Sequence, residues 1–267
     1  MSTEPQSPPV IVEHLEPREP ARNPTIGVLL IHGLNGSRFD MAQLAKILAE
    51  KGFVAENMLL PGHGTRVGDL MRIGWTDWDK AVQKELTALK QRCDMVFMIG
   101  HSVGGSLALH RAAHEEVAGI VTMCSPIHMF PWMRPLIRLG KYVLPMVPTI
   151  REDVRDPAGR ALYTRDVYRW TALWPVDSLI GFLPELRAEL HRVTCPALIM
   201  GSVHDHVIPY QDAVGIYRRI GSRDKHLVTF YHSFHVITKD YDREEVFTKT
   251  ISFIKQQASK VAKQKTA

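Results

Sequence analysis

Three residues whose types together can activate an alcohol lie in separate parts of this sequence, each shortly after a run of strand-forming residues. They are Ser102, Asp205 and His235. A serine hydroxyl is a poor nucleophile at neutral pH, and it becomes an effective one when a histidine takes its proton and a carboxylate orients that histidine. The sequence therefore raises the hypothesis of nucleophilic acyl transfer at Ser102.

The serine stands in the pattern G-x-S-x-G, with Gly100 two positions before it and Gly104 two positions after it. The strand formers Met95–Ile99 precede it and Ser106–His114 can form a helix, so the pattern predicts a nucleophile elbow, a strand that turns sharply into a helix. We expect the turn to bring the backbone of residues 100 and 104 together under the serine, where glycine avoids crowding. The hydroxyl then lies at a helix N-terminus, whose free N–H groups favour negative charge.

The aspartate and the histidine follow later strands. Asp205 comes after the apolar run Ala197–Gly201, and both His232 and His235 come after His226–Tyr231. Functional groups of open α/β sheets gather at the carboxyl ends of strands, and serine, acid, histidine is the chain order expected with a nucleophile elbow. We favour His235 as the base, because His232 follows its strand directly and has less slack to reach back over the serine.

Each assignment has an alternative. Asp205 could instead be a turn residue or the cap of the helix that begins near Gln211, and Asp177 is a second candidate for the acid. His204 and His206 flank Asp205, and we interpret them as exposed loop histidines rather than as ligands of a metal ion. No metal ion or organic cofactor is expected.

Negative charge that develops on a substrate oxygen needs backbone N–H groups already aimed at it. One should be the amide of Val103, directly after the nucleophile, and the other that of Leu34, in the loop after the first buried strand. His32 and Gly33 are expected to shape this loop rather than to take part in the chemistry. His101 is expected to pack or bond locally, because it lies on the wrong side of the elbow to act as the base.

The elements that would position these residues alternate as strand and helix, which is typical of a parallel sheet with helices on both faces. The alternation breaks at residues 126–178, which hold tryptophans, tyrosines and prolines but no buried strand run, and an insertion here would lie over the carboxyl edge of the sheet. The expected strands are 10–14, 27–32, 53–60, 95–99, 119–125, 197–201 and 226–231, and the expected helices are 39–51, 75–92, 106–114, 179–191, one from 211, and 242–257.

Length and composition favour one large domain with an insertion. With 267 residues, 45% of them apolar, the chain can bury a sizeable core. We predict an α/β core formed by residues 10–125 and 179–257 and a lid formed by residues 126–178. Residues 1–9 are rich in proline and serine and are expected to be disordered, and residues 258–267 are expected to be a solvated basic tail.

Charge and cysteine content narrow the class of protein further. The net charge is only +5 and lysines in or near the tail account for most of it, so no nucleic-acid partner is expected. The three cysteines, Cys93, Cys124 and Cys195, are far apart and odd in number, which favours reduced thiols in a cytoplasmic protein. The N-terminus lacks the basic and apolar regions of a signal peptide. No apolar run reaches the roughly 18 residues that span a membrane.

Several of these motifs, taken in order, resemble the α/β-hydrolase carboxylesterases and bacterial monoacylglycerol lipases of the thermostable small-esterase type. The resemblance covers about residues 25–257 and is weakest in the insertion. It implies an α/β-hydrolase fold with a mostly parallel sheet of about eight strands, a small lid, and a triad on the serine, aspartate and histidine already named. The motifs that carry it are His32–Ser37, Leu60–Gly64, Gly100–Gly105, Val121–Pro126, His204–Pro209 and His235–Thr238.

Two positions depart from the family pattern. Relatives often have glycine directly before the histidine, where this chain has Phe234, and often have an aromatic residue at the position of Leu34. Phe234 would change the conformation of the histidine loop or add an apolar wall to the site. Leu34 would make the wall of the acyl pocket smaller. Neither removes a catalytic group.

The function expected from these observations is hydrolysis of carboxylic esters with short- to medium-chain acyl groups, monoacylglycerols among them, through an acyl-enzyme. The partner would be a small-molecule ester, held in an apolar site lined by the Trp-, Met- and Leu-rich lid. The lid could also touch a lipid surface transiently, without stable insertion into a membrane. A thioesterase, peptidase, carbon–carbon hydrolase or perhydrolase, and a non-catalytic ligand-binding receptor, are the alternatives, and the oligomeric state stays open.

Overall fold

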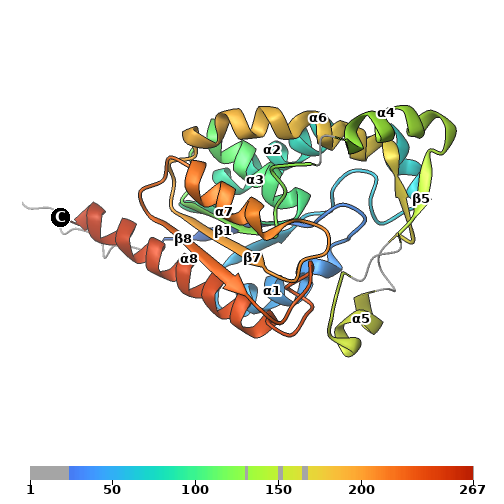
Figure 1. The fold of residues 1–267 in the computed structure, drawn as a ribbon. Helices are drawn as coiled ribbons and strands as arrows, with labels where there is room; N and C mark the ends of the chain where they lie inside the picture. Colours follow the sequence, from blue (N-terminus) through green and yellow to red (C-terminus); the bar gives the residue numbers. More distant parts are fainter. Residues whose placement is uncertain (1–23, 130–131, 150–152, 164–167, 267) are drawn as a thin grey trace, which may run out of the picture.

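A sheet of six parallel strands runs through the centre of the protein (Figure 1), and the order of the strands is β2-β1-β3-β4-β7-β8. This computed structural model describes residues 24–129, 132–149, 153–163 and 168–266. The expected disordered tail and the expected edge strand at 10–14 lie outside these residues. The strands are β1 (Ile26–Ile31), β2 (Val54–Asn57), β3 (Met95–His101), β4 (Gly119–Met123), β7 (Ala197–Ser202) and β8 (Lys225–Phe230).

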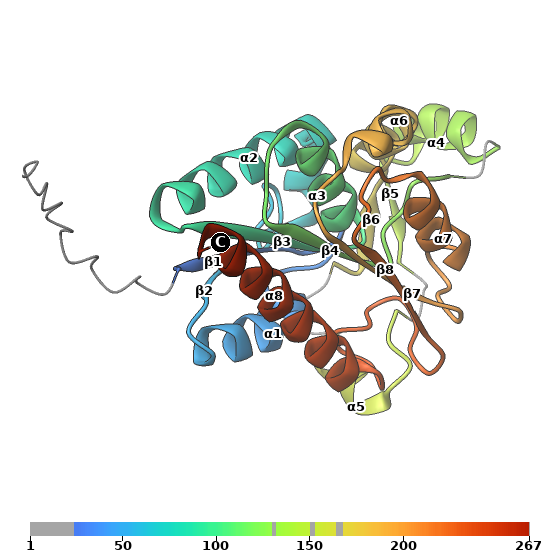
Figure 2. The same cartoon turned by 90° about the vertical axis from the view of Figure 1, so that its left-hand side faces the viewer.

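Helices cover both faces of the sheet, as the alternating sequence predicts. Figure 2 shows α1 and α8 below the sheet and the other long helices above it. Each layer of helices encloses its own hydrophobic cluster, so the sheet is buried on both faces. The lower layer consists of α1 (Phe39–Glu50) and α8 (Arg243–Thr266), and the upper layer consists of α2 (Trp75–Arg92), α3 (Val103–His114), α6 (Leu173–Glu189) and α7 (Tyr210–Arg219).

The apolar run of β1 shows why these segments become central strands. Leu29 and Ile31 point into the upper cluster, and Val28 and Leu30 point into the lower one. Successive side chains of a strand alternate between the two faces. A strand that is buried on both faces therefore needs a continuous apolar run rather than an alternating one.

The strand order places a topological switch point between β1 and β3. The chain runs from β1 outward to β2 on one side, and then from β3 outward through β4 and β7 to β8 on the other. Crossover connections leave these two central strands in opposite directions, so a crevice opens at their carboxyl ends. The loop after β1 and the turn after β3 meet at this crevice.

The expected number of about eight strands is wrong for the described residues, which form six in the main sheet. The segment 126–178 does contain strands, which the sequence did not predict, because each is only three residues long. These two, β5 (Met146–Pro148) and β6 (Trp170–Ala172), pair with each other in a separate antiparallel sheet. The same segment holds two helices, α4 (Met133–Val143) and α5 (Pro157–Tyr163).

Two helix boundaries also differ from expectation. Helix α6 begins at Leu173 and so crosses the boundary predicted between the lid and the core. Helix α8 continues to Thr266 where a solvated tail was expected, because Ala258 and Val261 extend its apolar stripe over the lower cluster. The remaining helical turns are the 3₁₀ helices η1 (Val67–Arg72) and η2 (Leu190–Arg192). None of the helices described here is long and apolar enough to cross a membrane.

Candidate active site

Ser102 lies at the switch point, on the sharp turn between β3 and α3. Its backbone has φ 52° and ψ −123°, a conformation that residues with a side chain rarely adopt. The amide of Ser102 donates a hydrogen bond to the carbonyl oxygen of Met123, at 2.8 Å, which ties the turn to β4. The residue is only 6% exposed. Strain of this kind persists only where the surroundings enforce it, and it is frequent at functional sites.

The flanking glycines permit this turn for two different steric reasons. A Cβ atom on Gly100 would lie 2.2 Å from the carbonyl oxygen of Gly104, as expected from the elbow pattern. A Cβ atom on Gly104 would instead lie 2.2 Å from the carbonyl oxygen of Ile31, at the end of β1. Glycine at the second position is therefore required by the close approach of α3 to the neighbouring strand, which the pattern alone did not indicate.

His235 and Asp205 are brought together beside the serine. The Nδ1 atom of His235 lies 2.8 Å from Oδ2 of Asp205, whose other oxygen accepts hydrogen bonds from the amides of Val207 and Ile208 at 2.8 and 2.9 Å. Burial acts to raise the pKa of Asp205, but the interaction with His235 and these two amide donors outweigh it, so the pKa is lowered. Asp205 is thus held as a carboxylate that fixes the orientation of the imidazole.

The alternative residues lie elsewhere. His232 is exposed and does not line the cavity that contains Ser102 and His235. Asp177 pairs with Lys141, at 2.5 Å, instead of approaching either histidine. His204 and His206 are exposed, and within the described segments neither belongs to a group of three or more side chains able to ligate a metal.

The loop after β1 is shaped by a buried histidine, as expected. His32 is fully buried, and its burial lowers its pKa to about 3. Its Nδ1 atom lies 2.8 Å from the carbonyl oxygen of Gly33, and its Nε2 atom accepts a hydrogen bond from the amide of Leu60 at 3.1 Å. Leu34 and Val103 both line the cavity, and neither of their amides finds an acceptor among the described residues. Two N–H donors are therefore available beside Ser102.

His101 makes a contact that sequence reasoning did not find. Its Nε2 atom donates a hydrogen bond to the backbone oxygen of His235, at 3.1 Å, and burial lowers its pKa to about 3. The rings of these two histidines lie 4.8 Å apart. His101 therefore holds the loop that carries His235 against the elbow, and the spacing of the two residues along the chain gave no signal of it.

A buried carboxylate joins the same loop to the segment 126–178. Both oxygens of Asp240 accept hydrogen bonds from backbone amides, those of Arg155, Asp156, Phe234 and Tyr241, at 2.7–2.8 Å. The two residues directly before α5 and the residue directly before His235 thus share one anchor. The sequence contained no motif that pointed to Asp240.

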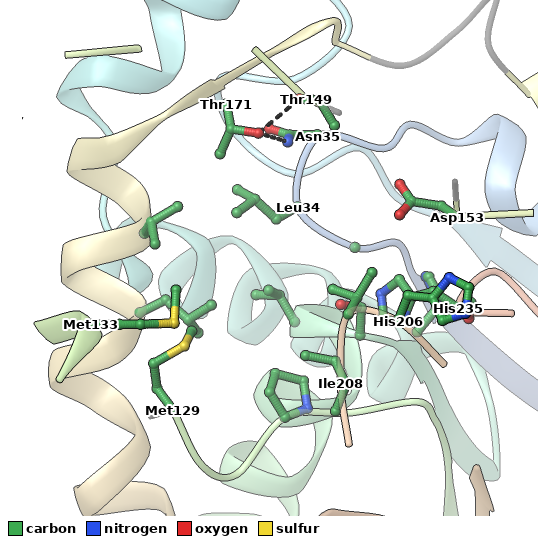
Figure 3. A pocket seen from close by; sticks show the side chains of 18 of the residues that line it. Leu34, Asn35, Met129, Met133, Thr149, Asp153, Thr171, His206, Ile208 and His235 are labelled. Atoms are coloured by element: carbon green, nitrogen blue, oxygen red, sulfur yellow. Dashed lines mark hydrogen bonds between the residues drawn. The ribbon is translucent and has the colours of Figure 1, made fainter. Parts of the chain in front are cut away.

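The cavity over Ser102 has a volume of about 770 Å³ and lies at the carboxyl ends of the strands. Figure 3 shows Met129 and Met133 at one end, Leu34 in the wall, and His235 beside His206 at another side. Most of its wall is apolar and comes from the segment 126–178, from α6 and from the loop after β7. The apolar residues of this wall include Met129, Met133, Ile137, Val147, Leu173, Val176, Leu179 and Ile208.

A polar group lies on another side of the cavity, apart from the methionines (Figure 3). Asn35 donates a hydrogen bond to Thr171 at 2.7 Å, and the hydroxyls of Thr171 and Thr149 lie 2.8 Å apart (Figure 3). Methionine and leucine of the insertion do line the cavity, as predicted. The prediction for tryptophan is wrong for Trp132 and Trp170, which point to solvent.

Phe234, the residue that departs from the family pattern, does not line the cavity. Its ring packs on His206, with the ring centres 4.2 Å apart, and His206 does line the cavity. The phenylalanine therefore acts on the cavity through His206 rather than as a wall. Leu34, the other departure, lies in the wall as expected.

Acid should destabilise the fold, because burial lowers the pKa of His32 and His101 to about 3 and that of His63 to about 4. The unfolded chain protonates these groups near pH 6.5, so the free energy of unfolding falls as the pH drops below that value. Asp40 acts in the opposite direction, because burial raises its pKa to about 7 and its contribution is lost as the pH rises. The three histidines outweigh it.

We therefore expect the melting temperature to be lower at pH 5 than at pH 7.5. In Asp40→Asn the opposing contribution disappears, so the decrease should be steeper than in the wild type. Thermal melts followed by circular dichroism at both pH values measure this. An equal or higher melting temperature at pH 5 would contradict the assignment of these histidines as neutral.

The fold and the arrangement at the switch point define a class, the α/β-hydrolases that carry a serine on the nucleophile elbow. Within this class, the chain belongs to the family described as serine aminopeptidase, S33, which it matches over residues 22–242. The expected α/β-hydrolase fold and the expected kind of enzyme, an esterase-like serine hydrolase, are confirmed at this level. The catalytic roles of the individual residues remain predictions.

Two curated relatives are similar over most of their length. The chain is 33% identical to a thermostable monoacylglycerol lipase of Bacillus sp. (strain H-257), covering 89% of this chain and 94% of that protein. It is 27% identical to a carboxylesterase of Bacillus subtilis (strain 168), covering 86% and 92%. These likenesses confirm the resemblance seen in the motifs.

Solved structures agree with this placement. A structure from work on the metagenome-derived lipolytic enzymes LipS and LipT has a TM-score of 0.81 and 31% identity, covering 86% of this chain and 94% of the other. A soluble variant of monoglyceride lipase from Saccharomyces cerevisiae has a TM-score of 0.73 at 19% identity, covering 89% of this chain and 88% of the other. At that identity the likeness supports the fold alone.

Proposed function

We propose that the protein hydrolyses carboxylic esters with short- to medium-chain acyl groups, monoacylglycerols among them. The observation that carries the proposal is that Ser102 and His235 line one cavity while Asp205 holds Nδ1 of His235 at 2.8 Å. With Nδ1 bonded to a carboxylate, Nε2 is the ring atom left to act as the base. The names of the relatives support an ester as the substrate.

The proposed reaction has two halves. Nε2 of His235 takes the proton of the Ser102 hydroxyl, and the serine oxygen adds to the ester carbonyl carbon. The carbonyl oxygen becomes negative and accepts hydrogen bonds from the amides of Leu34 and Val103. His235 gives its proton to the departing alcohol, which leaves an acyl group on the serine. Water, deprotonated by the same histidine, then releases the carboxylic acid.

The cavity fits an amphipathic ester. Its apolar wall, with Met129 and Met133 at the end, suits an acyl chain. The hydroxyl and amide groups of Asn35, Thr149 and Thr171 suit the free hydroxyls of a leaving alcohol such as glycerol. The family name also allows a peptide substrate. The apolar wall of the cavity favours an ester over a peptide.

A substrate series tests the function. Wild type should hydrolyse p-nitrophenyl esters from acetate to laurate and 1-monoacylglycerols of the same chain lengths, with a maximum among the short and medium chains. The matched peptide probe is an aminoacyl p-nitroanilide, which should react far more slowly. Faster turnover of the anilide than of every ester would assign a peptidase, and binding of esters without turnover of any would assign a receptor.

We propose further that the segment 126–178 forms a lid that touches lipid surfaces through α4. Helix α4 turns Met133 and Ile137 toward the cavity, yet its other face exposes large apolar side chains. Arg134 and Arg138, both exposed, stand beside them and suit lipid headgroups. The exposed apolar residues are Leu136, Leu139, Tyr142 and Val143, at 64%, 72%, 69% and 87%.

A long-chain monoacylglycerol added to this substrate series tests the contact. Leu139→Asp should lower turnover of dispersed long-chain monoacylglycerol and leave turnover of soluble p-nitrophenyl acetate unchanged. Leu162→Asp, at an exposed leucine of α5, is the matched control and should change neither. Equal losses on both substrates in Leu139→Asp would mean that α4 affects the reaction and not the lipid contact.

The cellular location of the protein and the division of the chain into core and lid also remain proposals. The three cysteines are unpaired, which supports a reducing compartment such as the cytoplasm. A core formed by residues 10–125 and 179–257, with the lid at 126–178, stays our proposed division, although α6 spans the second boundary. No nucleic-acid partner is proposed, and the oligomeric state is open.

A further inference from the structure

Three potential metal ligands meet at the ends of α3 and α6 that lie farthest from Ser102 along each helix. Nδ1 of His110 lies 2.5 Å from Oε1 of Glu189, and Nε2 of His114 lies 2.8 Å from Oε2 of the same carboxylate. One nitrogen of each histidine and one carboxylate oxygen all lie within 4.8 Å of one another. None of the three residues lines the cavity described above.

The two histidines share one face of α3 because they are four residues apart. Their ring centres lie 4.8 Å apart, and Glu189 is the last residue of α6. Two imidazoles and one carboxylate form a donor set that zinc accepts, with a fourth position left for water. Imidazole nitrogen also selects against calcium and magnesium, which prefer oxygen ligands.

A further carboxylate lies on the other side of His110. Oδ1 of Asp79 is 3.8 Å from Nε2 of His110, and the carboxylate pairs with Arg111 at 2.7 Å. If Nδ1 of a neutral His110 carries the ring proton, the lone pair of Nε2 faces this carboxylate, which is unfavourable. A metal ion on Nδ1 moves the ring proton to Nε2, where it faces Asp79. Ligating histidines usually have such a carboxylate on their second nitrogen.

The surroundings combine a closed wall with one open side. His110 and Glu189 are buried, and the rings of Trp75 and Phe182 pack against His110 with ring centres 5.5 and 5.3 Å away. The side chain of His114 is 36% exposed, which provides a path for an ion to enter. An apolar wall strengthens the attraction between a cation and the carboxylate.

We propose that His110, His114 and Glu189 bind one zinc ion that joins α3 to α6. Neighbouring ligand atoms of tetrahedral zinc are about 3.3 Å apart, so the present hydrogen-bonded contacts must open by less than about 1 Å, and the other ligand separations, which are at most 4.8 Å, must close by up to about 1.5 Å. The ion would replace the protons that these contacts now share. Because α6 also supplies Val176 and Leu179 to the cavity wall, zinc would fix that wall to the helix that begins at the nucleophile.

The competing explanation is a proton-held clamp without metal, in which His110 and His114 only donate hydrogen bonds to Glu189 and so join α3 to α6. Metal titration separates the two. Untagged, metal-stripped protein is titrated with ZnCl₂ by calorimetry, and with CoCl₂ while the visible absorption of tetrahedral cobalt is recorded. We expect one strong site per chain, a higher melting temperature with zinc, and the cobalt bands.

Two variants make the test specific. His114→Ala, at the most exposed ligand, should fold and should lose at least about tenfold in zinc affinity, together with the cobalt bands and the rise in melting temperature. His226→Ala removes a more exposed histidine that also lies beside a carboxylate, Asp224 at 3.2 Å, and should bind zinc as the wild type does. Circular dichroism checks that both variants are folded.

The titration decides between the zinc site and the proton-held clamp. No strong zinc site in the wild type, or equal affinity in wild type and His114→Ala, would overturn the zinc proposal and leave the proton-held clamp. Ester hydrolysis is an independent readout, because the three ligands do not touch the cavity. Metal-stripped protein should still hydrolyse p-nitrophenyl acetate, so failure of the zinc site would not be confused with failure of the proposed function.

Discussion

Replacing Ser102 by alanine should lower kcat for ester hydrolysis by roughly 10⁶-fold, the loss found when the nucleophile of a serine hydrolase is removed. Ser102 is the residue that the strained turn after β3 presents to the cavity, and no other serine lines it in the part of the chain that the structure describes. Single-turnover and steady-state assays with p-nitrophenyl butyrate measure the loss. Binding of a non-hydrolysable ester analogue should be retained, because the cavity is unchanged.

The two histidines after β8 provide a matched pair of controls. His235→Ala should lose activity to a similar degree, because the base is removed while Asp205 is left without its partner. His232→Ala, at an exposed position three residues earlier, should behave as the wild type. Substantial activity in His235→Ala, together with a loss in His232→Ala, would transfer the role of base to His232.

The second large effect is expected from Gly104→Ala. A Cβ atom there would lie 2.2 Å from the carbonyl oxygen of Ile31 and 2.7 Å from that of His32, so β1 and the loop that carries Leu34 must move. Both obstacles are backbone atoms, which cannot rotate away as a side chain can. We expect a loss of about 3 kcal/mol in the free energy of unfolding, at the upper end of overpacking effects, and a loss of activity in the molecules that stay folded.

Gly181→Ala is the matched control for this substitution. Gly181 lies inside α6, and nothing lies within 4 Å of a Cβ atom added there. Alanine should therefore stabilise the helix by up to about 1 kcal/mol. Urea unfolding of both variants, followed by circular dichroism, measures the difference. If Gly104→Ala were as stable and as active as Gly181→Ala, the close packing of α3 on β1 would be wrong.

The sequence was most informative where local chemistry decides the structure. The elbow, the continuous apolar run of β1 and the strand-then-loop positions of Asp205 and His235 each follow from a short pattern. Steric crowding explains the glycines of the elbow, and burial on two faces explains the apolar run. The strand-then-loop positions follow from the carboxyl edge that the strands of a parallel sheet share. That Ser102, Asp205 and His235 each follow a strand at the same carboxyl edge of the sheet could therefore be predicted from the sequence, and their catalytic roles stay predictions.

The features that could not be predicted depend on contacts between distant residues. The bond from His101 to the backbone of His235 joins residues 134 positions apart. The spacing of His110 and His114 is visible in the sequence, but Glu189 meets them only because α6 packs along α3. The expected tail after residue 257 is helical because its apolar side chains find the lower cluster, a tertiary effect that overrides its polar composition.

The anchor at Asp240 bears on how lids can be exchanged between relatives. One carboxylate holds the amides of Arg155 and Asp156 together with that of Phe234, the residue before the proposed base. A chimera whose foreign segment does not place two backbone amides here would leave this buried carboxylate with only the amides of Phe234 and Tyr241, and the histidine loop would shift with it. The stretch from α4 to β5 is tied to α6 instead, through the pair of Lys141 and Asp177. Residues 153–156 and 234–240 should therefore be inherited as one block, and an exchange between α4 and β5 should keep Lys141 together with Asp177.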